Sequence, residues 1–520
     1  MDLKLTKESV PASVSVFDGV QEQGIELDYI LPDYYPDIFR LIRCDTEPVI
    51  TEWSVSGGKL TYVLRCIIRL LYCGSAGEDS SVRCVVQQQE FTRTAELGSN
   101  APDTTVTISA SAGRINYRAV NKRRLDIRAA VSVKINASAP SSQEIVTDAG
   151  RSDIQLRRTP LKYAGGRITA QRTVQLSGEA ELSEAQPEAL SVIMQSCTPG
   201  SCELRLISGK LLAKGEAGIR VLYSCENGGS CALEDMTFSI PYSQVVDIEG
   251  ADESWICTAA AETVSCEITP SPDRNGQNRL LRCEIELRLS ITAVRPASVM
   301  AVSDAFSTVY PCDVETADIR AEFLPQSFSA SFRSSAKLAD GSAVPERIYA
   351  VWCTPRNINT HLSPDGSSAV ISGMLTYSMA ALDSEGMMIM TDHDETFEES
   401  FEPDEALPEG ASVSATISVS GVSYSISPEG ELSAAAELTA RLTAAGTRTF
   451  RAVTDILTDE TARKKRDGDY AVKLWFGSEN EDIWDIAKRC STPPAAIMEE
   501  NELVSESLAG GEMLLIPIKD

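Results

Sequence analysis

Residues 125–148 read LDIRAAVSVKINASAPSSQEIVTD, and the spacing of their apolar side chains is that of a long β-strand. Apolar side chains occupy alternate positions from Leu125 to Ile135, which is the period of a β-strand that buries one face. The pattern starts again at Leu281 and at Leu432, and each copy ends 23 residues later in an aspartate. A register kept over three copies predicts three copies of one β unit. The three endings are Val146-Thr147-Asp148, Val302-Ser303-Asp304 and Val453-Thr454-Asp455.

The segment upstream of each alternating strand repeats as well. A proline followed by an acidic residue begins it, and this pair is typical of the first turn of a short helix. A glycine-containing hairpin turn comes next, and in the first two copies the strand after it ends in a Leu-Tyr pair. We therefore expect a short helix and then a hairpin in every unit. The Pro-acid pairs are Pro36-Asp37, Pro187-Glu188 and Pro345-Glu346, and the Leu-Tyr pairs are Leu71-Tyr72 and Leu222-Tyr223.

Clusters of Gly, Asn, Asp and Ser separate the other alternating segments, and no long amphipathic helix lies between them. This favours antiparallel sheets, because parallel strands need long crossover connections. The chain is expected to be mainly β, with three antiparallel, sandwich-like repeat domains and a small α+β domain at the C-terminus. The predicted boundaries are 1–150, 151–318 and 319–460 for the repeats, the third being divergent, 461–469 for a basic linker and 470–520 for the C-terminal domain.

Composition restricts the partners and the compartment. The 520 residues include 47 Lys and Arg against 75 Asp and Glu, a net charge of −28. This charge argues against nucleic acid and against an anionic membrane surface as partners. Neither a signal-peptide core nor a membrane-spanning apolar run is present, so a cytoplasmic protein is expected. The 14 cysteines include no Cys-x-x-Cys spacing, which favours buried thiols over a metal site.

The densest acidic stretch lies in the third unit, at residues 392–405. One interpretation is an exposed edge strand whose charge prevents aggregation. The alternatives are a cation site or a docking surface for a basic partner. An EF-hand is excluded, because the calcium-loop spacing is absent.

After residue 469 the pattern changes. Residues 470–475 alternate like a strand, and Asp482 is placed to cap a helix over residues 483–489. Pro493 and Pro494 suit the first turn of a second helix, and residues 514–517 form a closing strand. The order strand, helix, helix, strand resembles a LysM domain, as do the stretches DIWDIAKR (482–489), NEL (501–503) and GGEMLLIP (510–517).

The LysM resemblance implies a groove for N-acetylglucosamine polymers between the loop before the first helix and the loop before the last strand. These loops depart from the family pattern, and the four basic and ten acidic residues of 470–520 give a net charge of −6, so glycan binding and protein docking both stay open. Trp484 is expected in the core rather than on a sugar platform. The implied ligand- or partner-binding residues are Glu479, Asn480, Glu481, Asp482, Asn501, Gly510, Gly511 and Glu512.

The repeats also resemble a known family. The stretch LPDYYPDI (31–38), followed by a cysteine and a Gly-turn hairpin, is similar to the SPOCS domain of clostridial and related Gram-positive spore formers. SPOCS repeats that end in a LysM are the layout of a family of coat morphogenetic proteins. That layout implies a structural protein that attaches the spore coat to the forespore surface on the mother-cell side. It also implies the ATPase of the coat scaffold as the protein partner.

The sequence gives no support to an enzyme. The two histidines, His361 and His393, have no equivalents in the other repeats, and no P-loop, Gly-x-Ser-x-Gly or His-Glu-x-x-His motif occurs. We therefore expect no catalysis, no cofactor and no metal. The alternative function is a cell-wall-associated protein whose LysM binds peptidoglycan or chito-oligosaccharide and whose β units act as spacers.

Overall fold

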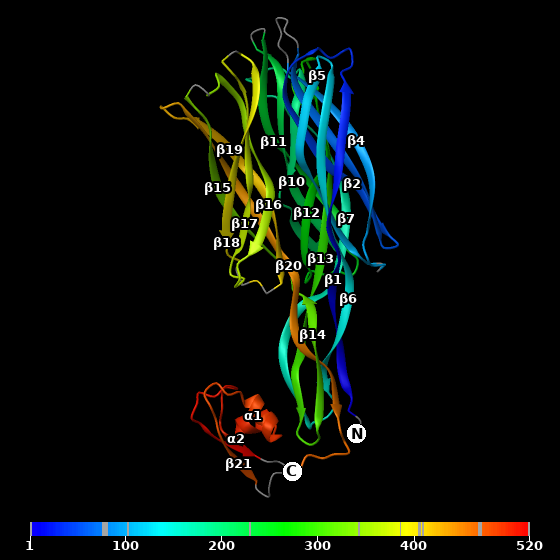
Figure 1. The fold of residues 1–520 in the computed structure, drawn as a ribbon, viewed down its shortest axis with the longest axis vertical. Coiled ribbons are helices and arrows are strands. Elements are labelled where there is room, and N and C mark those ends of the chain that lie inside the picture. Colours follow the sequence, from blue (N-terminus) through cyan, green and yellow to red (C-terminus); the bar gives the residue numbers. More distant parts are fainter. Residues whose placement is uncertain are drawn as a thin grey trace.

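The computed structural model describes residues 3–74, 82–100, 103–227, 230–341, 344–384, 386–403, 407, 410–465 and 471–517. Asp404 and Glu405 of the acidic stretch and residues 466–470 of the linker and C-terminal domain lie outside this range. Long antiparallel strands make up most of the chain (Figure 1), which confirms the prediction of a mainly β protein with several antiparallel sheets. No helix among the described residues is long and apolar enough to cross a membrane.

The first repeat consists of two three-stranded sheets packed face to face. The strand orders are β1-β6-β5 and β2-β3-β4. Leu125 and Ile127 of β6 meet Leu64 of β3 in one buried cluster, so the alternation in the sequence fills the core between the sheets. The strands are β1 (Leu5–Ile30), β2 (Ile38–Ser56), β3 (Lys59–Gly74), β4 (Val82–Glu96), β5 (Thr105–Asn121) and β6 (Arg124–Ala149).

The second repeat has the same design. Its sheets are β12-β13-β7 and β11-β10-β8, with the short β9 also beside β10. Its strands are β7 (Ile154–Glu181), β8 (Ser191–Pro199), β9 (Glu203–Ile207), β10 (Lys210–Asn227), β11 (Ser230–Asp247), β12 (Ile256–Ser271) and β13 (Leu280–Ser307).

In the third repeat, β14, β15 and β19 all pair with the long β20, and the second sheet is β16-β17-β18. The boundary expected after residue 318 falls inside β14, which pairs with β20, so we group β14 with the third repeat. The strands are β14 (Cys312–Glu322), β15 (Gln326–Asp340), β16 (Arg347–Leu362), β17 (Ala369–Leu382), β18 (Met388–Phe401), β19 (Ala411–Ile426) and β20 (Glu431–Thr458).

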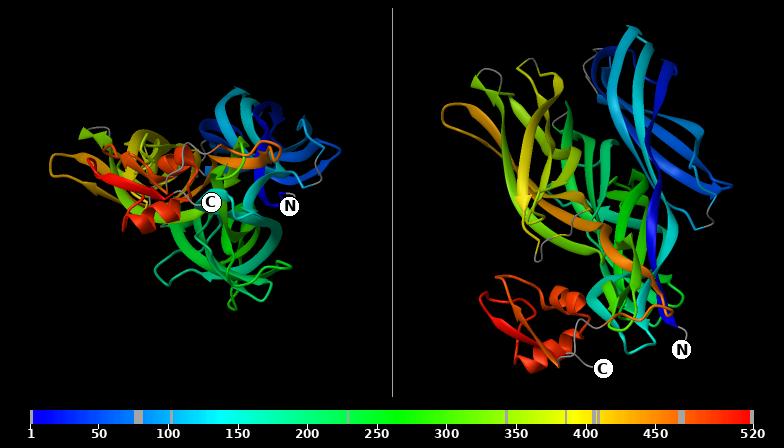
Figure 2. Two further views of the ribbon diagram at one scale, coloured as in Figure 1. Left: turned by 90° about the horizontal axis from the view of Figure 1, so that it is seen from below. Right: turned by 60° about the horizontal axis from the view of Figure 1, so that its bottom comes forward.

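Three further buried clusters are built from residues of all three repeats. One of them joins Val146, Val302 and Val453, the valines of the repeated endings. Seen from below, the repeats surround a common centre, and these clusters hold them together (Figure 2). The repeats therefore form one body. Members of the other two clusters are Val10, Leu161 and Ile319, and Leu71, Leu222 and Ala380.

The repeated endings form a β-bulge. Thr147 of β6 has no partner residue on β1, and its hydroxyl donates to the carbonyl oxygen of Thr6 at 3.2 Å. Ser303 and Thr454 make the same bond in the other two repeats, at 3.3 Å each. The middle position of the ending carries a hydroxyl because this group bonds across the bulge. The bulge in turn sets the direction of the aspartate that follows.

The prediction of a short helix at the Pro-acid pairs is wrong. In the first repeat the pair follows a turn, in which the Tyr35 N–H donates to the carbonyl oxygen of Pro32 at 3.0 Å, and the strand β2 begins directly after the pair at Ile38. The guanidinium of Arg123 donates to the carbonyl oxygens of Pro32 and Leu31, at 2.7 and 3.1 Å. Because a side chain satisfies these carbonyl groups, the segment needs no helical hydrogen bonds. Arg279 has the same role in the second repeat.

Candidate docking site of the C-terminal segment

The C-terminal segment folds as β21 (Val472–Phe476), α1 (Ile483–Cys490), α2 (Pro494–Glu500) and β22 (Met513–Pro517). Asp482 caps α1 as predicted, because its carboxylate accepts the backbone N–H of Trp484 at 2.8 Å. Apolar residues of both helices and of the two-stranded sheet share one buried cluster. Trp484 belongs to this cluster and is 7% exposed, which confirms that it is a core residue.

The structure brings the two predicted loops together. The backbone N–H of Asn480 donates to the carbonyl oxygen of Leu508 at 2.9 Å, and that of Leu508 donates to the carbonyl oxygen of Glu481 at 3.0 Å. Gly510 has a φ of 102°, and a β-carbon there would lie 3.0 Å from the Cβ of Glu479, so the contact requires glycine. The residues placed side by side are Glu479, Asn480, Glu481, Asp482, Gly510, Gly511 and Glu512.

Asn501 is bound elsewhere. Its side-chain amide donates to the carbonyl oxygens of Leu515 and Ile497, at 2.7 and 2.8 Å. Its side-chain oxygen accepts the N–H of Leu515 at 2.6 Å. These bonds hold the end of α2 against β22, so the role of Asn501 in this structure is to stabilise the segment.

Two of the loop carboxylates form hydrogen bonds and ion pairs within the chain. Glu481 accepts the indole N–H of Trp475 at 3.3 Å and the backbone N–H of Ser478 at 3.0 Å, and it lies 3.5 Å from the guanidinium of Arg489. Asp482, besides capping α1, pairs with Arg157 of the second repeat. Glu479 and Glu512 have no ion pair among the described residues, so they carry the acidic character of the loops.

Helix α1 is docked on the end of the second repeat through Asp304. The indole N–H of Trp484 donates to Asp304 Oδ2 at 2.7 Å, and Lys488 Nζ lies 2.7 Å from both carboxylate oxygens. The ring of Phe306 meets that of Trp484 edge to face, with centroids 5.1 Å apart. Lys464, from the predicted basic linker, donates to the carbonyl oxygen of Ser307 at 2.7 Å. The C-terminal segment is therefore held on the second repeat by an ion pair, by ring packing and by a hydrogen bond from the linker.

Sequence alone does not distinguish Asp304 from its two equivalents, Asp148 and Asp455. Asp148 pairs with Arg158 of the next repeat, and Asp455 pairs with Lys7 of the first. The strand registers show that the position of Lys7 and Arg158 is occupied in the third repeat by Thr316. Because Thr316 has no charge, Asp304 is left to bind the C-terminal segment.

Burial by itself would raise the pKa of Asp304, but the hydrogen bonds from Lys488 and Trp484 outweigh it and hold the pKa below its ordinary value of 3.8. A carboxylate whose pKa is lower in the docked state stabilises docking above its ordinary pKa. That stabilisation is lost as the pH falls through the lowered value. The contribution of Asp304 to docking is therefore fully present at neutral pH and declines only below about pH 3.8.

We expect Asp304→Asn to loosen the docked segment at neutral pH, because it removes a charged acceptor that receives two donors. Hydrogen bonds to charged groups contribute about 1.5–3 kcal/mol each. Exchange of the Trp484 indole proton, followed by NMR on protein labelled with ¹⁵N-tryptophan, should become at least tenfold faster. Asp148→Asn is the matched control, since this equivalent aspartate bonds Arg158 and not the segment. Equal exchange rates in the two variants would contradict the role of Asp304.

The outer face of the β21–β22 sheet is apolar and exposed. Val472, Leu474 and Phe476 alternate along β21 with exposed fractions of 43%, 54% and 75%, and Met513, paired with Phe476, is 56% exposed. Glu479, Glu506 and Glu512 lie in the loops that join this end of the sheet to the helices. Contiguous exposed apolar side chains with a polar border are typical of protein-binding surfaces.

Cysteine and histidine residues outside the C-terminal segment are mostly separate from one another in the part of the chain that the structure describes. Burial raises the pKa of the Cys44 thiol to about 12 and that of Cys66 to about 11, which suppresses the nucleophilic thiolate. Within the described residues, no group of three or more His, Cys, Asp or Glu side chains could hold a metal ion. His393 lies 3.7 Å from Glu395 on β18, while His361 is exposed on β16.

Comparison with known proteins links part of the chain to a described family. Residues 188–269 match the family described as SipL, SPOCS domain. The matched segment covers β8 to β11 and most of β12 in the second repeat. No curated protein sequence and no solved structure matches the chain. The match indicates a SipL-like, sporulation-associated protein.

Proposed function

We propose that this protein is a non-catalytic assembly protein that attaches the spore coat to the forespore surface, on the mother-cell side, through protein–protein contacts. The SPOCS match in the second repeat supports the sporulation context. The first and third repeats have the same arrangement of two packed sheets, so SPOCS-like units would account for the whole body. The shared buried clusters hold the three repeats in one body, whose surfaces we propose for contacts with other coat proteins.

The C-terminal segment, as a LysM-like module, is the proposed docking element for the ATPase of the coat scaffold. The apolar outer face of its sheet is the observation that favours a protein partner. This face borders loops whose Glu479, Glu506 and Glu512 have no ion pair among the described residues. An apolar strip with an acidic border suits a protein surface with an apolar centre and a basic border. A neutral sugar would gain little from the carboxylates.

The alternative function is binding of peptidoglycan, or of another N-acetylglucosamine polymer, in the groove that the LysM resemblance implies. One observation favours it, namely that residues 477–482 and 506–512 run side by side. The discriminating experiment is a pair of titrations on the full chain, one with the purified scaffold ATPase and one with chito-oligosaccharide. Tight sugar binding without ATPase binding would replace the docking function by wall binding.

We expect Phe476→Ser to weaken binding of the full chain to the scaffold ATPase at least tenfold, because Phe476 is the largest exposed ring on the apolar face. Chito-oligosaccharide binding should not change. Val504→Ser is the matched control, since Val504 is fully exposed on the same segment but lies outside the sheet. A loss of affinity in Val504→Ser as large as that in Phe476→Ser would contradict a specific surface on the sheet.

A further inference from the structure

Each repeat has one side where the first strand of one sheet faces the last strand of the other, and we call this side the seam. In the first repeat the seam lies between β1 and β4, and side chains close it. Gln21 donates to the carbonyl oxygen of Thr94 at 3.2 Å, and Arg93 donates to the side-chain oxygen of Gln23 at 2.8 Å. Gln89 of β4 donates to a further backbone carbonyl oxygen of β1 at 3.4 Å.

The third repeat has none of these closing side chains at its seam, between β15 and β18. The register of β15 on β20 places Ala330 and Phe332 at the positions of the two glutamines of β1. The register of β18 on β17 places Glu395 and Glu399 at the positions of the glutamine and the arginine of β4. Amide and guanidinium donors are thus replaced by apolar groups on one strand and by carboxylates on the other.

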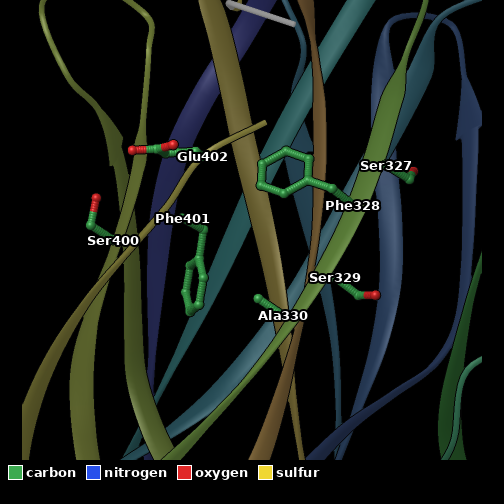
Figure 3. A pocket seen from close by; sticks show the side chains of 7 residues that line it. All are labelled: Ser327, Phe328, Ser329, Ala330, Ser400, Phe401 and Glu402. Carbon is green, nitrogen blue, oxygen red and sulfur yellow. The ribbon is translucent and has the colours of Figure 1, made fainter. Parts of the chain in front are cut away.

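The seam of the third repeat is hollow. A cavity of about 640 Å³ lies between β15 and the end of β18. The rings of Phe328 and Phe401 lie between the two strands, while Ser327 and Ser329 point to the other side of β15 (Figure 3). Ala330 adds a small apolar side chain to the lining. The opening therefore combines apolar groups, from the two rings and Ala330, with polar groups from the serines and Glu402.

Both strands that border this opening are sheet edges. Among the described strands, β15 pairs only with β20 and β18 only with β17, so one backbone edge of each has no strand partner. Phe332 stacks on Phe397 below the opening, with centroids 5.4 Å apart, which keeps the two sheets together without closing the edges. Unpaired edges of this kind accept an added strand.

The charge at the opening is negative. Glu395 and Glu399 alternate with Phe397 and Phe401 on the half-buried side of β18, and Glu402 lines the cavity. Glu399 and Glu402 have no ion pair among the described residues. A second copy of this seam would bring carboxylates against carboxylates, so the charge favours a basic occupant over self-association.

We propose that the seam between β15 and β18 binds an extended segment of a partner protein in which basic and apolar side chains take turns on one face, that is, at every second residue. The segment adds a strand to an edge of the third repeat. Its apolar side chains enter the cavity between Phe328 and Phe401, and its basic side chains pair with Glu395 and Glu399. This surface lies on the repeat body, so the inference goes beyond the docking function proposed for the C-terminal segment and does not depend on it.

The test uses the full chain and a fluorescein-labelled octapeptide, Lys-Ser-Val-Ser-Lys-Ser-Val-Ser, which presents Lys and Val in turn on one face when it is extended. We expect saturable binding, followed by fluorescence anisotropy, and slower amide hydrogen exchange in β15 or β18 when the peptide is bound. The double substitution Glu395→Gln and Glu399→Gln should weaken binding at least tenfold. Glu399→Arg, which restores the residue type of the first repeat, should abolish it.

Glu398→Gln is the matched control, because Glu398 is an exposed carboxylate on the same strand that points away from the seam. It should change the affinity less than twofold. The same peptide with Glu in place of both Lys residues, and the same peptide with a central proline, should both fail to bind. Absence of saturable binding, exchange protection elsewhere than in β15 and β18, or an equal effect of Glu398→Gln would each overturn the proposal.

Discussion

Val302→Asp is expected to unfold the whole three-repeat body, not the second repeat alone. Val302 is fully buried where it meets Val146 and Val453, so each repeat contributes to the cluster that the substitution disrupts. A buried carboxylate without a partner costs on the order of 3–5 kcal/mol. Because domains are stable by only about 5–15 kcal/mol in total, a loss of this size leaves little of the folded state.

Thermal unfolding followed by circular dichroism should show one β-sheet transition that moves to much lower temperature. Met300→Asp is the control, because Met300 lies on the same strand with 47% of its surface exposed, and it should unfold close to the unsubstituted protein. If Val302→Asp leaves protease-resistant first and third repeats, the repeats are independent domains that do not share a cooperative core.

The strands could be predicted from the sequence because alternation is a local property of each strand. The patterns that start at Leu125, Leu281 and Leu432 lie on β6, β13 and β20. The clusters shared between repeats could not be predicted in this way. Alternation shows that one face of a strand is buried, but not whether the second sheet of the same repeat or another repeat covers it. Val146 is such a residue, since its place at the common centre depends on how the repeats pack.

In the C-terminal segment, the two neighbouring loops could be predicted from the sequence, but the contact with Asp304 could not. The LysM resemblance pointed to residues 479–482 and 510–512, which lie together in the structure. Asp304 shares the repeated Val-Thr/Ser-Asp ending with its two equivalents. The sequence pattern therefore does not reveal that Asp304 binds the C-terminal segment. The difference is at the partner position, where Lys7 and Arg158 correspond to Thr316, and this correspondence appears only after the strands are paired.

Trp484→Ala is expected to unfold the C-terminal segment while the three-repeat body stays folded. The substitution removes a buried indole from the cluster that joins both helices to the sheet, which costs about 3–5 kcal/mol. It also removes the donor to Asp304 Oδ2 and the ring that meets Phe306. Calorimetry should show loss of the small transition of the segment with the main β transition in place.

Trp484→Phe separates the two roles of this side chain. Phenylalanine retains a ring for the core and for the contact with Phe306, but it cannot donate to Asp304. We expect it to keep the transition of the segment and to cost about 1.5–3 kcal/mol of docking, less than Asp304→Asn, which also weakens the bond to Lys488. An alanine variant whose segment melts as the unsubstituted one does would show that the indole is a surface contact. If the phenylalanine variant loses the transition of the segment as the alanine variant does, the indole bond to Asp304 is required for the segment to fold. In that case the segment folds only in contact with the second repeat.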